Sequence, residues 1–155
     1  MSQRLLRTDL ELAAFASLGA AGLATAIFAS SPFAHGAWLI AYLLLVGFLA
    51  QFLLGVGQRA LFPSDSSCLP PWRVRFAQAG LWNVGVIAVP LGVLSEARLV
   101  VVIGSVSLLA ALTSLWLTAG RDRASWRSRG YATLLIGMAA SVFVGTALAW
   151  DLPWT

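Results

Sequence analysis

The chain has 155 residues, of which 59% are hydrophobic and only 10% are charged, and its mean hydropathy is +0.85. Soluble domains carry about 25% charged residues, so the composition excludes an ordinary soluble domain and indicates an integral membrane protein. All ten basic residues are arginine. The lack of lysine excludes a Schiff base with retinal or pyridoxal phosphate, and it excludes a phosphate-loop lysine.

The chain holds one histidine, His35, and one cysteine, Cys68. This pair excludes a structural zinc site, a Cys-x-x-Cys redox motif, c-type haem attachment and an internal disulfide. The six acidic residues fall at helix ends or in loops. Ion-coupled pumps normally carry an ionisable side chain near the membrane midplane, so this distribution argues against one.

Uncharged runs define the expected spans in chain order. The first run, residues 12–58, is long enough for two crossings, and the cluster from Ser30 to Gly36 divides it. A loop rich in serine and proline follows, and a tight turn at Ser95–Arg98 separates the third and fourth spans. We expect one all-α domain, a bundle of five transmembrane helices at about 11–29, 37–58, 74–95, 99–119 and 131–150.

Arginine counts predict the orientation of the spans. Nine of the ten arginines fall in the N-terminal segment and the second and fourth loops, and Arg98 alone falls on the other side. The positive-inside rule then places the N-terminus in the cytoplasm and the C-terminus outside. We expect a bacterial cytoplasmic (inner) membrane protein, surrounded by lipid and without nucleic-acid partners.

Small residues recur at helical spacing in several spans, which predicts close helix packing within the monomer or in an oligomer. One such stripe runs along the fifth span and comprises Gly137, Ser141, Gly145 and Ala149. Others lie on the fourth span (Gly104, Ser107, Ala111, Ser114), the first (Ala13, Ser17, Ala20, Ala24) and the second (Gly47, Gln51, Gly55).

Gln51 and Asn83 are the polar residues within the spans that we expect to be most informative. Both are expected about 10–12 Å from the cytoplasmic surface, where they are expected to face the interior and to share a hydrogen bond. The alternatives are a structural polar clamp and a contact to a substrate or quinone. Pro90 is expected to kink the third span, which would matter for function if a pocket opened beside Trp82 and Asn83.

His35 opens the second span, and Gly36, Gly47, Gly55 and Pro63 follow it. This segment of about 30 residues resembles the transmembrane pattern of small relatives of the haem-copper oxidase subunit I superfamily. The resemblance implies His35 as a possible haem ligand. The other histidines that this superfamily uses for its haems and copper are missing here. Bis-histidine ligation would therefore need two copies of the chain.

The loop before the fifth span is basic and contains a tryptophan. It comprises Arg121, Arg123, Trp126, Arg127 and Arg129. Such a patch suits anionic lipid headgroups or a protein partner, and it also serves as a topology signal.

Three functions stay open after the sequence is read. The first is a non-catalytic accessory or assembly subunit of a larger membrane complex, which predicts a membrane protein partner. The second is a homo-oligomeric small-solute transporter or channel. The third is a haem- or metal-binding redox protein that uses His35. For the accessory subunit we expect no enzyme activity, no resident metal and no cofactor. For the redox protein we expect haem.

Overall fold

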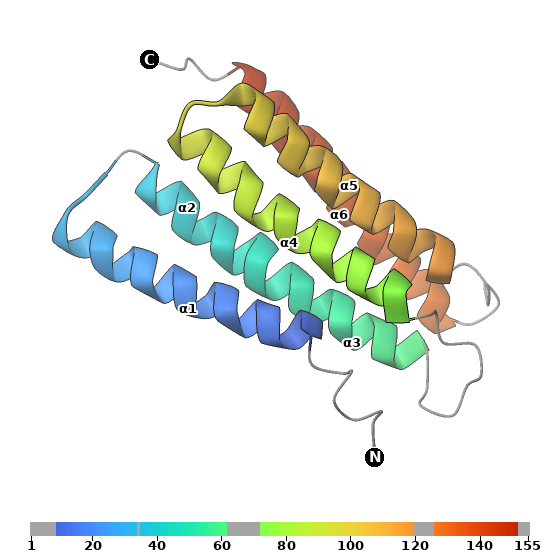
Figure 1. Ribbon diagram of the computed structural model, residues 1–155. Helices are drawn as coiled ribbons and strands as arrows, with labels where there is room; N and C mark the ends of the chain where they lie inside the picture. Colours follow the sequence, from blue (N-terminus) through green and yellow to red (C-terminus); the bar gives the residue numbers. More distant parts are fainter. Residues whose placement is uncertain (1–8, 34, 62–71, 120–125, 152–155) are drawn as a thin grey trace. The chain divides into compact units, whose positions relative to one another are not determined.

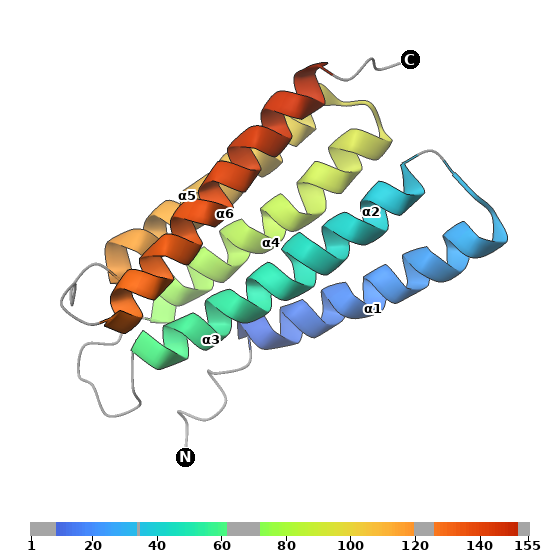
Figure 2. The ribbon, with the colours of Figure 1, turned by 180° about the vertical axis from the view of Figure 1, so that it is seen from behind.

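A computed structural model describes residues 9–33, 35–61, 72–119 and 126–151 (Figure 1), and Figure 2 shows the same helices from behind. Within these ranges every regular element is helical, which confirms the all-α prediction for them. A helix satisfies its backbone hydrogen bonds within one segment, as lipid requires. Backbone contacts divide the chain into two units, residues 1–59 and 60–155, and each is described by itself. The single domain stays a prediction.

Four helical segments are long and apolar enough to cross a membrane. They are Leu10–Ser30, Gly36–Gln58, Arg73–Leu94 and Arg98–Thr118. These bounds agree closely with the first four predicted spans, because runs of apolar residues end at charged or turn-forming residues. The apolar part of the last helix within the described residues, Arg129–Phe143, is shorter.

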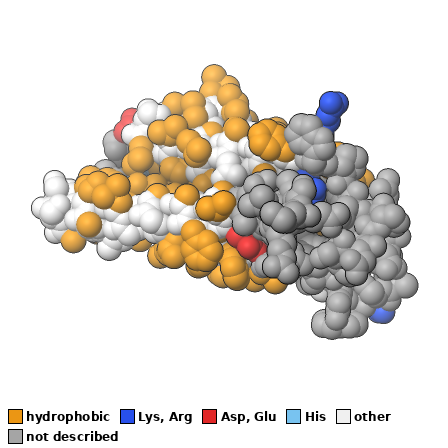
Figure 3. Space-filling model, turned by 60° about the horizontal axis from the view of Figure 1, so that its bottom comes forward, with side chains coloured by type: hydrophobic (Ala, Val, Ile, Leu, Met, Phe, Trp, Pro, Cys, Tyr) orange, Lys and Arg blue, Asp and Glu red, His pale blue; other side chains and the backbone are white. Residues whose placement is uncertain are grey.

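Large apolar side chains lie exposed along these helices, and they cover much of the described surface in Figure 3. Soluble proteins rarely expose apolar patches of this kind. The most exposed include Leu12, Leu23, Phe76, Leu99, Leu117 and Phe143. Such a surface suits a lipid environment.

The first unit pairs helix α1 (Asp9–Ser30) with one long helical segment. That segment consists of α2 (Gly36–Tyr42), the π-helix η2 (Leu43–Ala50) and α3 (Gln51–Leu61). Phe15 of α1 contacts both Phe48 and Phe52, with ring centroids 6.0 and 6.4 Å apart. The π-helix was not predicted. Its wider turn is rare in proteins and leaves no clear mark in apolar periodicity.

The buried face of α1 consists of small residues, as predicted, but it is turned by one position from the predicted stripe. Ala24 of the predicted stripe is buried, but its buried neighbours are Ala14 and Ala21, whereas Ala20 is exposed. Alanine and glycine are so frequent in this helix that two small-residue stripes pass through it. The sequence alone does not distinguish them.

The connection from α1 to α2 ends in a turn at His35, which adopts the left-handed conformation with φ 63°. Gly36 follows it because a side chain does not fit at that position. A Cβ built on Gly36 would lie 2.7 Å from Cε2 of Phe28. The Phe28 ring also meets Phe33 edge-on, with centroids 5.7 Å apart. The predicted break in the first uncharged run is thus a packed turn.

The second unit is built on an antiparallel helix pair, α4 (Trp72–Leu94) and α5 (Arg98–Ala119), seen side by side in Figures 1 and 2. Glycines bring the two backbones together. A Cβ on Gly85 would lie 2.8 Å from the Gly104 carbonyl oxygen, and one on Gly92 would lie 2.6 Å from the Val101 nitrogen. Gly104 likewise lies against the backbone of Val89. Small residues permit this approach in membrane helices.

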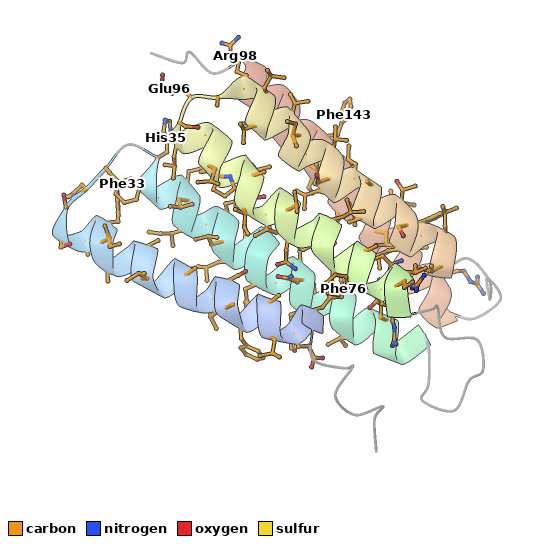
Figure 4. All side chains as sticks on the ribbon, viewed as in Figure 1. Phe33, His35, Phe76, Glu96, Arg98 and Phe143 are labelled. Carbon is orange, nitrogen blue, oxygen red and sulfur yellow. The ribbon has the colours of Figure 1, made fainter. Side chains whose placement is uncertain are left out.

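The turn between α4 and α5 has the hydrogen bonds of a Schellman motif. The Ala97 N–H donates to the Gly92 oxygen at 2.8 Å, and the Glu96 N–H donates to the Val93 oxygen at 3.3 Å. Glu96 takes the left-handed position of this motif, with φ 55°. Figure 4 labels Glu96 and Arg98 at this turn.

Helix α6 (Trp126–Asp151) follows and packs against α5. Tyr131 and Leu135 are buried one turn apart. Phe143 is 71% exposed and extends outward from α6 in Figure 4.

Candidate functional site

A polar clamp joins α4 and α5 inside the second unit. The Gln78 amide nitrogen donates to the Ser114 hydroxyl at 3.0 Å and to the Thr118 hydroxyl at 3.4 Å. Gln78 is only 2% exposed. Hydrogen bonds between membrane helices are worth on the order of 1 kcal/mol, so the clamp contributes modestly to stability. Its geometry also fixes the register of the two helices.

Thr118 completes the clamp by bonding its own helix. Its hydroxyl donates to the Ser114 and Leu115 carbonyl oxygens, at 3.1 and 2.9 Å. The hydroxyls of Ser107 and Thr113 likewise donate hydrogen bonds to backbone oxygens of their own helix. Ser114 differs, since within the described part of the chain its hydroxyl only accepts.

Trp82 lies one turn after Gln78 on α4, and residues at this spacing share a helix face. It is 1% exposed, and its indole Nε1 has no hydrogen-bond acceptor among the described residues. Gln78 meets Ser114 and Gly85 meets Leu108, so Trp82 is level with the buried Ala111 between these pairs. An indole N–H without an acceptor in an apolar interior costs free energy.

Tyr131 of α6 is a second buried polar group of this unit. It is 6% exposed, and its hydroxyl has no partner among the described residues. Helical side chains lean toward the N-terminus of their helix, so the phenol points toward the Arg129 end of α6. A buried polar group without a protein partner is commonly explained by a bound water or ligand.

Gln51 and Asn83, which the sequence singles out, fall in different units. Gln51 is fully buried at the start of α3. Asn83 is half-buried, and its amide nitrogen donates to the Ala79 carbonyl oxygen of its own helix at 2.8 Å. That bond gives Asn83 a local structural role. A hydrogen bond between Asn83 and Gln51 stays a prediction.

The structure places a carboxylate near Gln51 that the sequence assigned only to a helix end. Glu11 lies in the first turn of α1, and its Cγ is 3.6 Å from the Cβ that Gly55 would carry. Gln51 and Gly55 lie one turn apart on α3 and share a face. Gly55 therefore provides room for the Glu11 side chain between α1 and α3.

His35, the histidine predicted as a possible haem ligand, is exposed in the turn before α2. Its left-handed backbone gives it a structural role in that turn. No group of three or more metal-binding side chains occurs within the described ranges.

The predicted basic patch lies mostly beyond what the structure describes. Arg121 and Arg123 fall outside the described residues, and the side chains of Trp126 and Arg127 do so as well. Arg129 is exposed in the first turn of α6. Arg73, in the first turn of α4, is also exposed.

Sequence reasoning missed the clamp formed by Gln78 with Ser114 and Thr118. Gln78 lies close behind Arg73 and Arg75 and therefore looks like a residue at the headgroup level. A usable signal was nevertheless present. Gln78 and Ser114 are 36 residues apart, with Glu96 of the tight turn at their midpoint, and an antiparallel hairpin brings such residues together.

Comparison of the chain with described protein families, curated proteins and solved structures found no match. The resemblance to the haem-copper oxidase superfamily is thereby neither supported nor refuted. The function proposed below depends on the residues of this chain alone.

Proposed function

We propose that the chain is a small integral membrane protein that serves as a non-catalytic accessory or assembly subunit of a larger membrane complex. It would cross the bacterial cytoplasmic membrane five times, with the N-terminus inside. The arginine distribution supports this orientation. The length of α6, 26 residues, supports a fifth crossing, because about 20 residues span a bilayer.

The observation that carries the proposal is the open small-residue face of α6. Gly137 and Ser141 are exposed one turn apart, and a Cβ on Gly137 would meet nothing within 4 Å. The Ser141 hydroxyl is satisfied by the Gly137 carbonyl oxygen at 2.8 Å, so it does not need water. Faces with small residues at this spacing bind other helices in membranes. We infer that α6 binds a transmembrane helix of a partner.

The Arg121–Arg129 segment would lie at the cytoplasmic surface under this topology. Arginine side chains there attract anionic lipid headgroups. This contact would orient the N-terminal end of α6 at the membrane surface and leave its outward face available to the partner.

Affinity purification with Gly137→Leu tests the proposal. We expect the tagged wild-type chain to elute from its native membrane, in gentle detergent, with one larger membrane protein in fixed ratio. A Cβ at Gly137 meets nothing within 4 Å, so Gly137→Leu adds its side chain on the open face. The amount of co-eluting partner should fall at least tenfold in the variant, as measured by quantitative mass spectrometry. The helicity and yield of the variant itself should not change.

Gly80→Leu is the matched control, because Gly80 of α4 is also exposed and has open space around it. It should retain the partner. Equal loss in both variants would contradict the role of α6. A homogeneous self-assembly with no second protein would overturn the accessory function and favour the homo-oligomeric transporter.

A further inference from the structure

Three arginines lie at one end of the second unit, on two different helices. Arg73 and Arg75 are in the first turn of α4, and Arg129 is in the first turn of α6. The hydrogen bonds of Gln78 place the start of α4 beside the end of α5. Helix α6 packs against α5, and its start lies at this same end in Figures 1 and 2. The fold therefore brings Arg129 to the end of the unit that also carries Arg73 and Arg75.

The two helices that carry these arginines add further positive charge to this end. Both α4 and α6 direct the positive N-terminal end of their macrodipole here, whereas α5 alone contributes a negative C-terminal end. No acidic residue occurs in the first turn of α4 or of α6. An arginine at a helix N-terminus is electrostatically unfavourable, and a bound anion offsets both the side-chain charge and the helix end. This end of the unit is thus suited to an anionic ligand.

The opposite end of the same unit has a different balance of charge. Arg98 is exposed in the first turn of α5, but Glu96, which is also exposed, precedes it by two residues. The two opposite charges offset each other there. An anion is therefore attracted to the end that carries Arg73 and Arg129.

The position of the arginines selects the class of anion. Arg73 begins the candidate span Arg73–Leu94, and Arg129 begins the apolar stretch Arg129–Phe143. Residues that begin a span lie at the level of the lipid headgroups, whose phosphates are the anions present there. Arg73 and Arg129 are exposed, so a headgroup reaches them without entering the packed interior.

A guanidinium group pairs with phosphate through two parallel hydrogen bonds. We propose that Arg73 of α4 and Arg129 of α6 bind the headgroup phosphates of anionic phospholipid, phosphatidylglycerol in a bacterial membrane. The inference rests on the membrane location in the proposed function, and it extends the lipid contact of the Arg121–Arg129 segment to a second helix. Bound lipid would hold the starts of α4 and α6 at the same level of the membrane.

Lipid binding by the purified full-length chain tests the assignment. The chain in neutral detergent is titrated with phosphatidylglycerol, and native mass spectrometry gives the apparent Kd. The wild type should bind phosphatidylglycerol with saturation and bind phosphatidylcholine more weakly. Arg73→Gln and Arg129→Gln should each raise the apparent Kd about fivefold, the usual contribution of one arginine beside anionic lipid. Arg73→Lys and Arg129→Lys keep the charge and should restore most of the binding.

Two further arginines provide matched controls, because each variant removes one positive charge outside the site. Arg98→Gln changes the other end of α5, whose 22 residues separate the two ends by about 33 Å. That distance exceeds the Debye length of about 8 Å. Arg7→Gln changes the N-terminal segment, on the same predicted side of the membrane. Both variants should bind phosphatidylglycerol within about twofold of wild type, and inorganic phosphate should not compete.

Several results would overturn the proposal. Equal weakening in Arg7→Gln would assign the binding to the net charge of the chain. Competition by inorganic phosphate would assign it to free anions. Phosphatidylglycerol bound no more tightly than phosphatidylcholine, or bound unchanged by the double variant Arg73→Gln with Arg129→Gln, would remove the site. The lysine variants decide the case if a glutamine variant loses helicity. Because the purified chain is used alone, failure here leaves partner capture by α6 untouched.

Discussion

Glu96 holds a left-handed backbone conformation that an L side chain adopts at a cost. Its N–H bonds the Val93 oxygen while Ala97 bonds Gly92, so the turn keeps Glu96 in that position. The left-handed region costs roughly 1–2 kcal/mol for a residue with a Cβ. Glycine occupies it without this penalty and is the usual residue at this position of the motif.

Glu96→Gly should therefore stabilise the protein by about 1 kcal/mol, somewhat less than the full penalty because glycine also gains entropy when unfolded. The measurement is equilibrium unfolding in bicelles. Ser95→Gly provides the control, since Ser95 does not have a positive φ. It should leave stability unchanged or lower it. A destabilised Glu96→Gly would mean that the carboxylate has a role that outweighs the backbone.

His35 shows how a single residue can suggest two roles in a sequence. Its chemistry suggests a ligand, and its place before Gly36 suggests a turn. The structure places His35 in the turn, with φ 63°. The distinction was beyond the sequence because backbone conformation at a non-glycine residue is set by the packing of Phe28 and Gly36 around it.

Helices α4 and α5 pack through glycines whose surroundings are backbone atoms. Gly92 faces the Val101 nitrogen and the Ala97 oxygen, at 2.6 and 3.1 Å from a built Cβ. Backbone atoms cannot change rotamer to make room, so an added methyl group must separate the helices.

Gly92→Ala should destabilise the fold by about 1–3 kcal/mol, the usual cost of overpacking. Gly80→Ala on the same helix should be neutral or stabilising, because its Cβ meets nothing within 4 Å and alanine favours the helix. Chemical unfolding of both variants in the same detergent gives the comparison. Equal stability of the two would contradict close packing at Gly92.

The extents of the helices were largely predictable, whereas their faces were not. Charged and turn-forming residues bound each apolar run, so the first four spans begin and end near their predicted residues. Gly104 was predicted to pack. Gly85 and Gly92 were not predicted to pack. Which glycines contact a neighbouring helix depends on helix register. A membrane helix that is apolar on all its faces gives little indication of that register in its sequence.

At the scale of the whole molecule, orientation in the membrane is open to a direct test. Cys68 is the only cysteine, and the arginine distribution predicts that it faces the cytoplasm. A membrane-impermeant maleimide should not label it in intact spheroplasts and should label it after permeabilisation. The double variant Cys68→Ser with Ser31→Cys should be labelled without permeabilisation, because Ser31 lies in the opposite connection. Labelling of Cys68 in intact spheroplasts would contradict the orientation.

The polar residues show the limit of reading a membrane sequence one helix at a time. Gln51 is buried as predicted, and Asn83 bonds its own helix. The clamp of Gln78 was missed because its partners lie on another helix. Polar atoms in lipid must find partners, but which partners they find depends on how helices come together.

The three-residue turn between α4 and α5 bears on how the protein enters the membrane during synthesis. Helix α4 carries Pro90, which interrupts its backbone hydrogen bonds, and Gln78, whose amide donates to a hydroxyl of α5, so alone in lipid it would leave polar groups unsatisfied. Translation delivers α5 directly afterwards, and with it the hydroxyls of Ser114 and Thr118. The two helices would therefore leave the insertion machinery as one hairpin, and a ribosome stalled between them would expose a helix that the bilayer does not readily retain.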